Sequence, residues 1–338
     1  MSKALRNMEM FGSMRAIVFE NYGAPTAVMK LASKSVPKPN ADEVLVKVKN
    51  CSINAADRHM VRANYFIIRA LLGFFSPGSR VLGMDLAGTV ARCGENVANF
   101  QVGDDVVADV RTSYGGGFAE YAVVKAANLV KKPHEISFQQ AAAVPISGQA
   151  AMMGITLCQI QQGDKVLVNG ASGGVGSFGV QIAKAQGAHV TAMCSAVKAA
   201  AVKEWGADVV IDSAQTSVMQ LKNDEYDAVF DAASFDDPNA FSATLKKTGR
   251  YVLVGGDFYN MLKLKLGGRF YGRESQTFTA LTQEVSVNEN IEKVLALIKK
   301  GVLAPAIQKV VPLQQVPEAI ESLENRSVVG KIIIDNQT

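Results

Sequence analysis

The stretch VLVNGASGGVG, residues 166–176, decides the fold of this chain. An apolar strand ending at Asn169 runs directly into a glycine-rich turn. The turn opens a helix whose apolar face is marked by Val175, Phe178 and Ile182. This order of strand, turn and helix is the context that a dinucleotide fingerprint requires. The stretch therefore predicts a dinucleotide-binding α/β domain, with a mere tight turn as the alternative.

Each small residue of the turn has a physical role. Gly173 lets the backbone approach a pyrophosphate, and Gly176 lets the helix pack closely on the strand. The helix N-terminus offers N–H groups and a positive dipole end to the phosphates. Ala171 replaces the first Gly of G-x-G-x-x-G, so the match is A-x-G-x-x-G. The predicted cofactor contacts in this turn are Ala171, Ser172, Gly173, Gly174 and Val175.

The end of the second strand decides between NAD and NADP. An NAD enzyme carries an acid there, about 20 residues after the turn, to bind the ribose hydroxyls. Here the strand ends at Cys194 without an acid, and Ser195 and Lys198 can meet a 2′-phosphate. We therefore predict NADPH, although Lys198 as an ordinary solvated lysine is the alternative. Gly255, at the end of a later strand, is also placed among the cofactor contacts.

Two patterns of expected secondary structure divide the chain. Up to about Pro133 the sequence alternates short strands with Gly and Pro punctuation, as in Glu43–Lys49. After Gln161, strands alternate with helices, which indicates a parallel sheet covered by helices. We expect a mainly-β substrate domain over 1–134 (1–14 an extension), a nucleotide-binding domain over 135–275, and a segment over 276–338 that returns to the first domain.

Composition and charge exclude several classes of protein. The 338 residues are 48% apolar and 20% charged, with a net charge of +4 and no long basic run. These values are typical of a globular protein and do not indicate a nucleic-acid partner or a membrane-surface footprint. The apolar stretch 141–158 is interrupted by Pro145, Gly148 and polar residues, so no membrane span is expected.

The cysteines and the N-terminus indicate a cytoplasmic location. The four cysteines lie far apart, without C-x-x-C spacing, which favours reduced thiols over a disulfide framework or a cysteine-rich zinc site. Residues 1–15 lack the apolar region of a secretory signal. Lys3 and Arg6, with little acid nearby, leave an organelle-targeting segment as the alternative.

Four further phrases carry a family resemblance. They are VLGMDLAG at 81–88, VGDDV at 102–106, GFAEY at 117–121 and AAVP at 142–145. Together with the glycine turn, they resemble the medium-chain dehydrogenase/reductase superfamily over nearly the whole chain, from about Met14 to Asp335. The resemblance implies the fold class α/β, with a GroES-like mainly-β substrate domain and a Rossmann domain built on a doubly wound parallel sheet.

The resemblance also implies that the reaction uses no zinc. In zinc-dependent members, the phrase at 81–88 carries a His-Glu pair, which here is Met84 and Asp85. The two other metal-ligand positions fall at Asn54 and near Ile146. Asn, Met and Ile do not replace a set of thiolates and imidazole as zinc ligands. We therefore expect no metal.

Within the superfamily, the pattern is similar to the quinone oxidoreductases, especially the branch with reticulon-interacting mitochondrial and chloroplast-envelope homologues. That resemblance implies an active cleft between the domains and a homodimer. It places Asn54 and Asp57 beside the nicotinamide and Arg326 near the adenosine phosphate. Some relatives cover that phosphate with a Tyr, where this chain has Ser213.

A metal-free site favours reduction of an acceptor that is already electrophilic. We predict hydride transfer from NADPH to a small hydrophobic quinone or α,β-unsaturated carbonyl. Tyr65 and His59 are the candidate proton donors. The alternatives are an aromatic lining or core packing for the apolar stretch 65–75, and a structural role for His59.

Two other functions stay open. An enoyl-thioester reductase would need a basic patch for a coenzyme A or carrier-protein phosphate, to which Arg62, Arg69 and Arg80 could belong. A catalytically silent NADPH-binding interaction protein would keep the glycine turn without turnover. Assays with a quinone, an alkenal and an enoyl-CoA discriminate among these functions.

Overall fold

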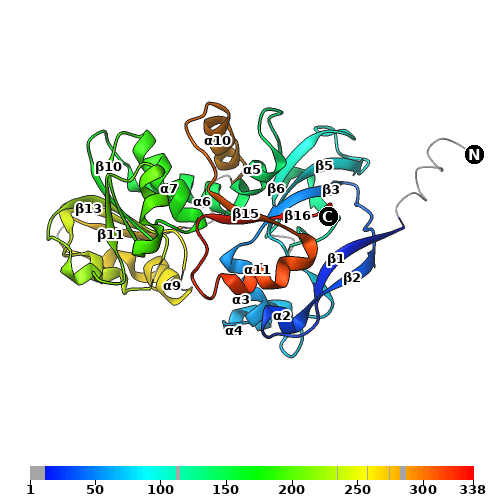
Figure 1. The fold of residues 1–338 in the computed structure, drawn as a ribbon, viewed down its shortest axis with the longest axis horizontal. Helices are drawn as coiled ribbons and strands as arrows, with labels where there is room; N and C mark the ends of the chain where they lie inside the picture. Colours follow the sequence, from blue (N-terminus) through cyan, green and yellow to red (C-terminus); the bar gives the residue numbers. More distant parts are fainter. Residues whose placement is uncertain (1–11, 112–114, 234, 257, 274, 282–286) are drawn as a thin grey trace, which may run out of the picture. The chain divides into compact units, whose positions relative to one another are not determined.

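The glycine-rich stretch joins strand β9 (Lys165–Asn169) to helix α7 (Gly174–Ala185). This computed structural model describes residues 12–111, 115–233, 235–256, 258–273, 275–281 and 287–338 (Figure 1). The described residues form two compact units. Unit 1 contains the chain up to Pro145 with Lys309–Ser327 and Ile332–Thr338, and unit 2 contains Ile146–Gln308 with Val328–Lys331.

Unit 2 is built on a six-stranded parallel sheet with the order β11-β10-β9-β12-β13-β14. Besides β9, its strands are β10 (His189–Cys194), β11 (Val209–Asp212), β12 (Tyr226–Asp231), β13 (Leu245–Leu253) and β14 (Thr277–Ala280). Counted from β9, the order is 3-2-1-4-5-6, that of a doubly wound dinucleotide-binding sheet. The order reverses between β9 and β12, and ligands bind outside the carboxyl ends of the strands at such a point.

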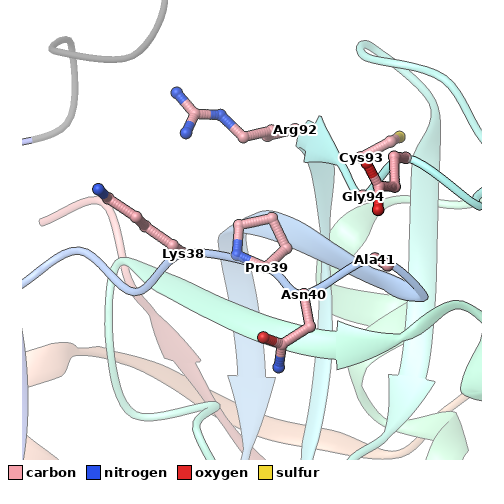
Figure 2. Close-up of a pocket in the computed structure, with 8 residues that line it drawn as sticks. Lys38, Pro39, Asn40, Ala41, Arg92, Cys93 and Gly94 are labelled. Atoms are coloured by element: carbon pink, nitrogen blue, oxygen red, sulfur yellow. The ribbon is translucent and has the colours of Figure 1, made fainter.

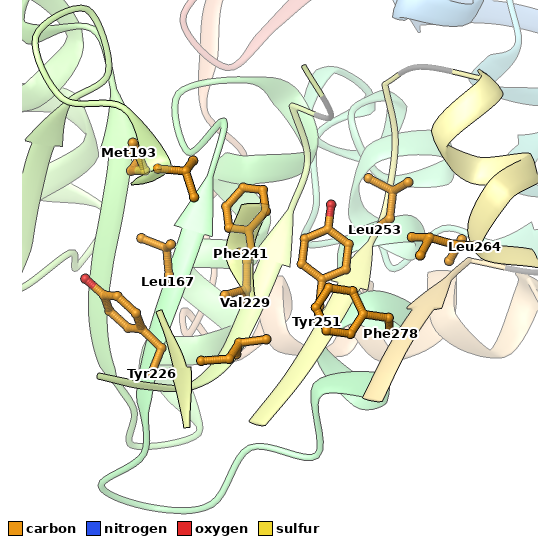
Figure 3. Close-up of a cluster of buried hydrophobic side chains, with 12 residues drawn as sticks. Leu167, Met193, Tyr226, Val229, Phe241, Tyr251, Leu253, Leu264 and Phe278 are labelled. Carbon is orange, nitrogen blue, oxygen red and sulfur yellow. The ribbon is translucent and has the colours of Figure 1, made fainter. Parts of the chain in front are cut away.

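Helices cover this sheet. They are α6 (Gln149–Cys158), α7, α8 (Ala199–Glu204), α9 (Phe258–Gly267) and α10 (Val287–Lys299). Helix α7 packs on β9 and β10, α6 packs on β12 and β13, and α10 packs on α6. One core of unit 2 lies over β12 and β13, with Leu167, Phe241 and Tyr251 among its buried side chains (Figure 3).

Unit 1 contains the mainly-β part of the chain. Strand β3 (Glu43–Ser52) pairs antiparallel with β5 (Asp85–Cys93), β7 (Tyr121–Lys125) and β16 (Lys331–Asp335). The same sheet includes β6 (Asp105–Asp109), β8 (Leu129–Lys131) and β15 (Ile307–Pro312). A second sheet contains β2 (Met29–Ser35), β1 (Ser13–Phe19) and β4 (Arg80–Val81). The C-terminal strand, red in Figure 1, therefore completes a sheet begun near the N-terminus.

The helices of unit 1 are short. They are α2 (Pro25–Val28), α3 (Ala55–Arg62), α4 (Phe66–Leu72), α5 (Phe138–Ala142) and α11 (Val316–Ser322). Helix α11 packs on α2 and α3. Elsewhere, 3₁₀ turns span Ala126–Asn128, Ala196–Lys198, Val218–Gln220, Pro238–Phe241, Gly268–Phe270 and Leu313–Gln315, and a π-helical turn spans Val144–Gly148.

The expected fold class is confirmed, with differences in detail. The later strand that was expected to end at Gly255 spans Leu245–Leu253. The segment expected to return to the first domain from 276 does so only at Lys309, because β14 extends the parallel sheet and α10 packs on α6. The apolar stretch 141–158 folds into the end of α5, the π-helical turn and α6. Within the described residues, no helix has the length and apolarity to cross a membrane.

Candidate active site

The glycine turn has the close packing expected of a dinucleotide fingerprint. Gly170 has a φ of +74°, and a Cβ there would lie 2.9 Å from the Ala233 Cβ. A Cβ on Gly176 would overlap the carbonyl oxygen of Gly170 and lie 2.7 Å from the Ala171 Cα. The start of α7 therefore touches the turn directly, and only glycine permits this contact.

Gly173 has the opposite environment. A Cβ on Gly173 would meet no atom closer than the Gly170 oxygen, at 3.5 Å. Gly173 is also the N-cap of α7, whose first turn carries no acidic side chain. The positive end of the helix dipole therefore faces a space that lacks a capping carboxylate. This arrangement fits a nucleotide diphosphate.

A segment from the C-terminal part of the chain closes one side of the turn. The Gly330 amide donates to the Ser172 oxygen at 2.8 Å, and the Lys331 amide donates to the Ala306 oxygen at 2.7 Å. A Cβ on Gly174 would lie 2.7 Å from Lys331 Cδ and 2.9 Å from Ser147 Oγ. Sequence reasoning assigned a cofactor contact only to Arg326 in this part of the chain and missed the contact of Gly330 with the turn. The signal was the glycine itself, whose φ of +72° brings it against Ala306.

The residues expected to select NADPH follow β10. Ser195 is the N-cap of the 3₁₀ turn at Ala196–Lys198, and Lys198 Nζ donates to the Val328 oxygen at 2.9 Å. Burial lowers the pKa of Lys198. Asp212 Oδ1 accepts from the Ala196 amide at 3.2 Å. The strand after β10, which is β11, therefore supplies the acid Asp212 to the 3₁₀ turn at Ala196–Lys198. The prediction from sequence considered only the end of β10 and missed this acid.

The nicotinamide-side candidates form a buried polar cluster in unit 1. Asp85 accepts from the Ser52 amide at 2.7 Å, from Ser52 Oγ at 2.6 Å and from Asn54 Nδ2 at 2.9 Å. Asp57 Oδ2 accepts from the Asn54 amide at 2.9 Å, and Asp57 Oδ1 accepts from the Gly83 amide at 3.3 Å. Asp57 and Asp85 are fully buried. The two carboxylates therefore fix Asn54 at the start of α3.

This cluster lies at two of the three positions that the resemblance matches to metal ligands of zinc-dependent members. The Asn54 amide nitrogen donates to Asp85, and the Met84 oxygen accepts from the Val110 amide at 2.9 Å. Ile146 belongs to unit 2. Among the residues that the structure describes, no group of three or more His, Cys, Asp or Glu side chains could hold a metal ion. The donor chemistry of Asn, Met and Ile does not fit zinc.

The two candidate proton donors contact each other. The His59 and Tyr65 rings lie 5.2 Å apart between centroids. His59 Nε2 lies 3.4 Å from Arg58 Nη2, and His59 Nδ1 lies 3.2 Å from Asn64 Nδ2. Because a guanidinium only donates, the contact with Arg58 requires an unprotonated Nε2. In a neutral imidazole the proton then lies on Nδ1, so His59 and Tyr65 both stay candidate proton donors.

The stretch 65–75 does not pack as core throughout. Ile68 and Leu72 are buried, but Phe66 is 70% exposed and Phe75 is 89% exposed. The Phe66, Phe74 and Phe75 rings contact each other in edge-to-face geometry, at 5.7 and 5.2 Å between centroids. Core packing, one of the two alternatives for this stretch, is wrong for these three rings, because Phe66 lies on the exposed face of α4 while Phe74 and Phe75 follow the end of that helix.

A surface cavity of unit 1 contains none of the predicted site residues. Its volume is about 290 Å³, and Figure 2 shows that its lining comes from residues 38–41 and 92–95. Burial raises the pKa of the Cys93 thiol at its edge. A protonated thiol is a weak nucleophile, so this cavity adds nothing to the candidate site.

Arg326 and Gly255 complete the predicted positions. Arg326 follows α11 in unit 1 and has a φ of +50°. Gly255 follows β13 in unit 2, and a Cβ there would meet no atom within 4 Å. The contacts of both residues with a cofactor stay predictions.

An open glycine turn on a doubly wound sheet, in a chain that also has a mainly-β unit, is the arrangement expected of a nicotinamide-dependent oxidoreductase. Family models match residues 40–134 (alcohol dehydrogenase GroES-like domain) and 205–334 (zinc-binding dehydrogenase). The chloroplast envelope quinone oxidoreductase homolog of Arabidopsis thaliana is 31% identical, over 95% of this chain and 98% of its own length. The chain belongs to the medium-chain dehydrogenase/reductase superfamily, in its quinone oxidoreductase-like branch.

Two further relatives agree with this assignment. The chloroplastic NADPH-dependent alkenal/one oxidoreductase of Arabidopsis thaliana is 30% identical, over 95% of this chain and 79% of that protein. The solved structure of the quinone oxidoreductase from Coxiella burnetii matches with a TM-score of 0.85 at 26% identity, over 96% of this chain and 99% of that one. The chain is thus an NAD(P)H-dependent reductase. Both plant relatives have chloroplast names, so the expected cytoplasmic location stays a prediction.

Proposed function

We propose that this protein uses NADPH, without zinc, to reduce a small hydrophobic quinone or an α,β-unsaturated carbonyl. The observation that carries the proposal is Asn54 at a former metal-ligand position, with its amide nitrogen bonded to Asp85 at 2.9 Å. A site without a metal has no Lewis acid to ionise a saturated alcohol. Reduction of an electrophilic acceptor needs only a hydride and a proton. The names of the quinone and alkenal/one relatives support this choice.

The chain's own residues bind the cofactor, orient it and donate a proton to the acceptor. The bound cofactor supplies the hydride. The turn at Gly173 holds its diphosphate, and Asn54, fixed by Asp57 and Asp85, orients the nicotinamide side. The Tyr65 hydroxyl gives a proton to the acceptor oxygen that gains electrons, or to the adjacent carbon by way of water. The predicted homodimer is part of this proposal.

Steady-state assays test the proposed function. We expect NADPH oxidation with a quinone and with an alkenal, and equal rates with and without a metal chelator. Turnover of an enoyl-CoA alone would identify an enoyl-thioester reductase, in which arginines such as Arg69 bind the acceptor. Tight NADPH binding without turnover of any acceptor would instead favour the silent binding protein. Inhibition by the chelator would contradict the zinc-free mechanism.

Replacement of Lys198 by Ala should reduce the preference for NADPH. Removal of this ammonium group takes one cation from the predicted 2′-phosphate site, and a charge-assisted bond contributes about 1.5–3 kcal/mol. We expect the ratio of NADPH to NADH kcat/KM to fall by about tenfold, with little change for NADH. Lys203→Ala, at an exposed position of α8, is the matched control and should keep the wild-type ratio. An unchanged ratio in Lys198→Ala would show that Lys198 is a structural lysine.

A further inference from the structure

A buried chain of three polar side chains crosses the carboxyl ends of the parallel sheet. Tyr251 Oη donates to Asp231 Oδ2 at 2.6 Å, and Asn169 Nδ2 donates to Asp231 Oδ1 at 3.0 Å. Asp231 and Tyr251 are fully buried, and Asn169 is buried. Figure 3 shows Tyr251 within the core of unit 2, where its ring stacks on Phe278.

The three hydrogen-bonded side chains lie directly beside the glycine turn. Asn169 is the last residue of β9 and Asp231 the last of β12, and the two are register partners where the strand order reverses. Asn169 directly precedes Gly170. Asp231 Oδ1 also accepts from the Ala233 amide at 2.9 Å, and Ala233 is the residue that packs on Gly170. One carboxylate therefore holds both the entrance of the turn and the backbone beside it.

The hydrogen-bonding chemistry of Asn169, Asp231 and Tyr251 permits a single arrangement of these three side chains. A buried carboxylate is stable only when donors surround it, and Asp231 receives them from Asn169, Ala233 and Tyr251. Burial and the negative charge of Asp231 hold the pKa of Tyr251 well above its usual range. Tyr251 therefore stays a donor throughout the working pH range, and the geometry of the carboxylate does not alternate.

We propose that Asp231 and Tyr251 are positioning residues for the cofactor, which keep the turn from Gly170 to Gly173 in the shape that receives a diphosphate. Neither residue needs to touch the cofactor. This inference rests on the proposed binding of the dinucleotide at the turn. It adds a determinant of affinity on β13, in the hydrophobic core, to a turn that lies between β9 and α7.

The test compares two buried tyrosines of the same core. Tyr251→Phe removes the hydroxyl that donates to Asp231. Tyr226 lies at the amino end of β12 (Figure 3), and Tyr226→Phe removes a buried hydroxyl that is hydrogen-bonded to Thr191 of β10. Calorimetric titration should show about threefold to tenfold weaker binding of both NADPH and NADH to Tyr251→Phe. At saturating cofactor its kcat should be close to that of the wild type. Tyr226→Phe should bind both cofactors with wild-type affinity, even where its melting temperature falls as far.

A second measurement distinguishes a local change at the glycine turn from a general loss of stability in the variant. Amide hydrogen exchange at Ala233 and Gly170 should be faster in Tyr251→Phe than in Tyr226→Phe, because the Ala233 amide donates to Asp231. Unchanged affinity and exchange in Tyr251→Phe, or equal losses of affinity in both variants, would overturn the positioning role. A wild-type protein that binds neither cofactor would contradict the proposed function instead.

Discussion

Gly176→Ala should weaken cofactor binding by roughly a hundredfold, because it displaces the turn that is proposed to hold the diphosphate. The new Cβ would overlap the Gly170 oxygen and lie 2.7 Å from the Ala171 Cα, and both are backbone atoms that cannot rotate away. Such overpacking also lowers the free energy of unfolding by about 1–3 kcal/mol. Calorimetric titration with NADPH and urea denaturation measure the two effects.

Substitutions of two other glycines in unit 2 distinguish an effect on cofactor binding from an effect on folding. Gly267→Ala adds a Cβ that meets only Phe270 Cδ2, at 3.7 Å, so it should change neither quantity. Gly173→Ala adds a Cβ whose nearest neighbour is the Gly170 oxygen at 3.5 Å, so it should preserve stability, but it should weaken binding because the methyl group would stand where the diphosphate is proposed to approach. Wild-type affinity in both Gly173→Ala and Gly176→Ala would show that the dinucleotide binds elsewhere.

Local patterns predicted the elements that hold the turn. The strand ending at Asn169, the helix that follows the glycine turn and the strand ending at Cys194 lie where they were expected, because hydrophobic periodicity and glycine chemistry act over a few residues. By contrast, the short helices α3 and α4 had no sequence prediction, because each has eight residues or fewer, a length over which a helical pattern is hard to tell from other patterns.

The hydrogen-bonded parts of the candidate site could not be predicted in this way. Asp231 lies 62 residues from Asn169, and only the folded sheet brings the two side chains together. Likewise, an isolated β-bridge places Gly330 beside Gly173. Sequence identifies which residue types a site needs. It does not identify the partners that orient them when those partners lie on other strands.

Asp85→Ala should be the most destabilising substitution in the polar cluster of unit 1. It leaves the Ser52 amide, the Ser52 hydroxyl and the Asn54 amide group without the acceptor that each has in the wild type. A buried donor left unsatisfied costs about 1–3 kcal/mol, so we expect the free energy of unfolding to fall by about 3 kcal/mol or more. Urea denaturation at neutral pH measures this loss, and Asp42→Ala, at an exposed position, should show little change.

Asp85→Asn connects this cluster to catalysis. It keeps the shape of the side chain and one acceptor oxygen, but the new amide group faces donors and cannot hold Asn54 as the carboxylate does. We expect kcat to fall by about tenfold while the affinity for NADPH stays unchanged, because the glycine turn belongs to unit 2. A fall in affinity with unchanged kcat would contradict the placement of Asn54 beside the reacting atoms. With the expected result, the position that holds a metal ligand in zinc-dependent relatives is here a hydrogen-bonded orienting group.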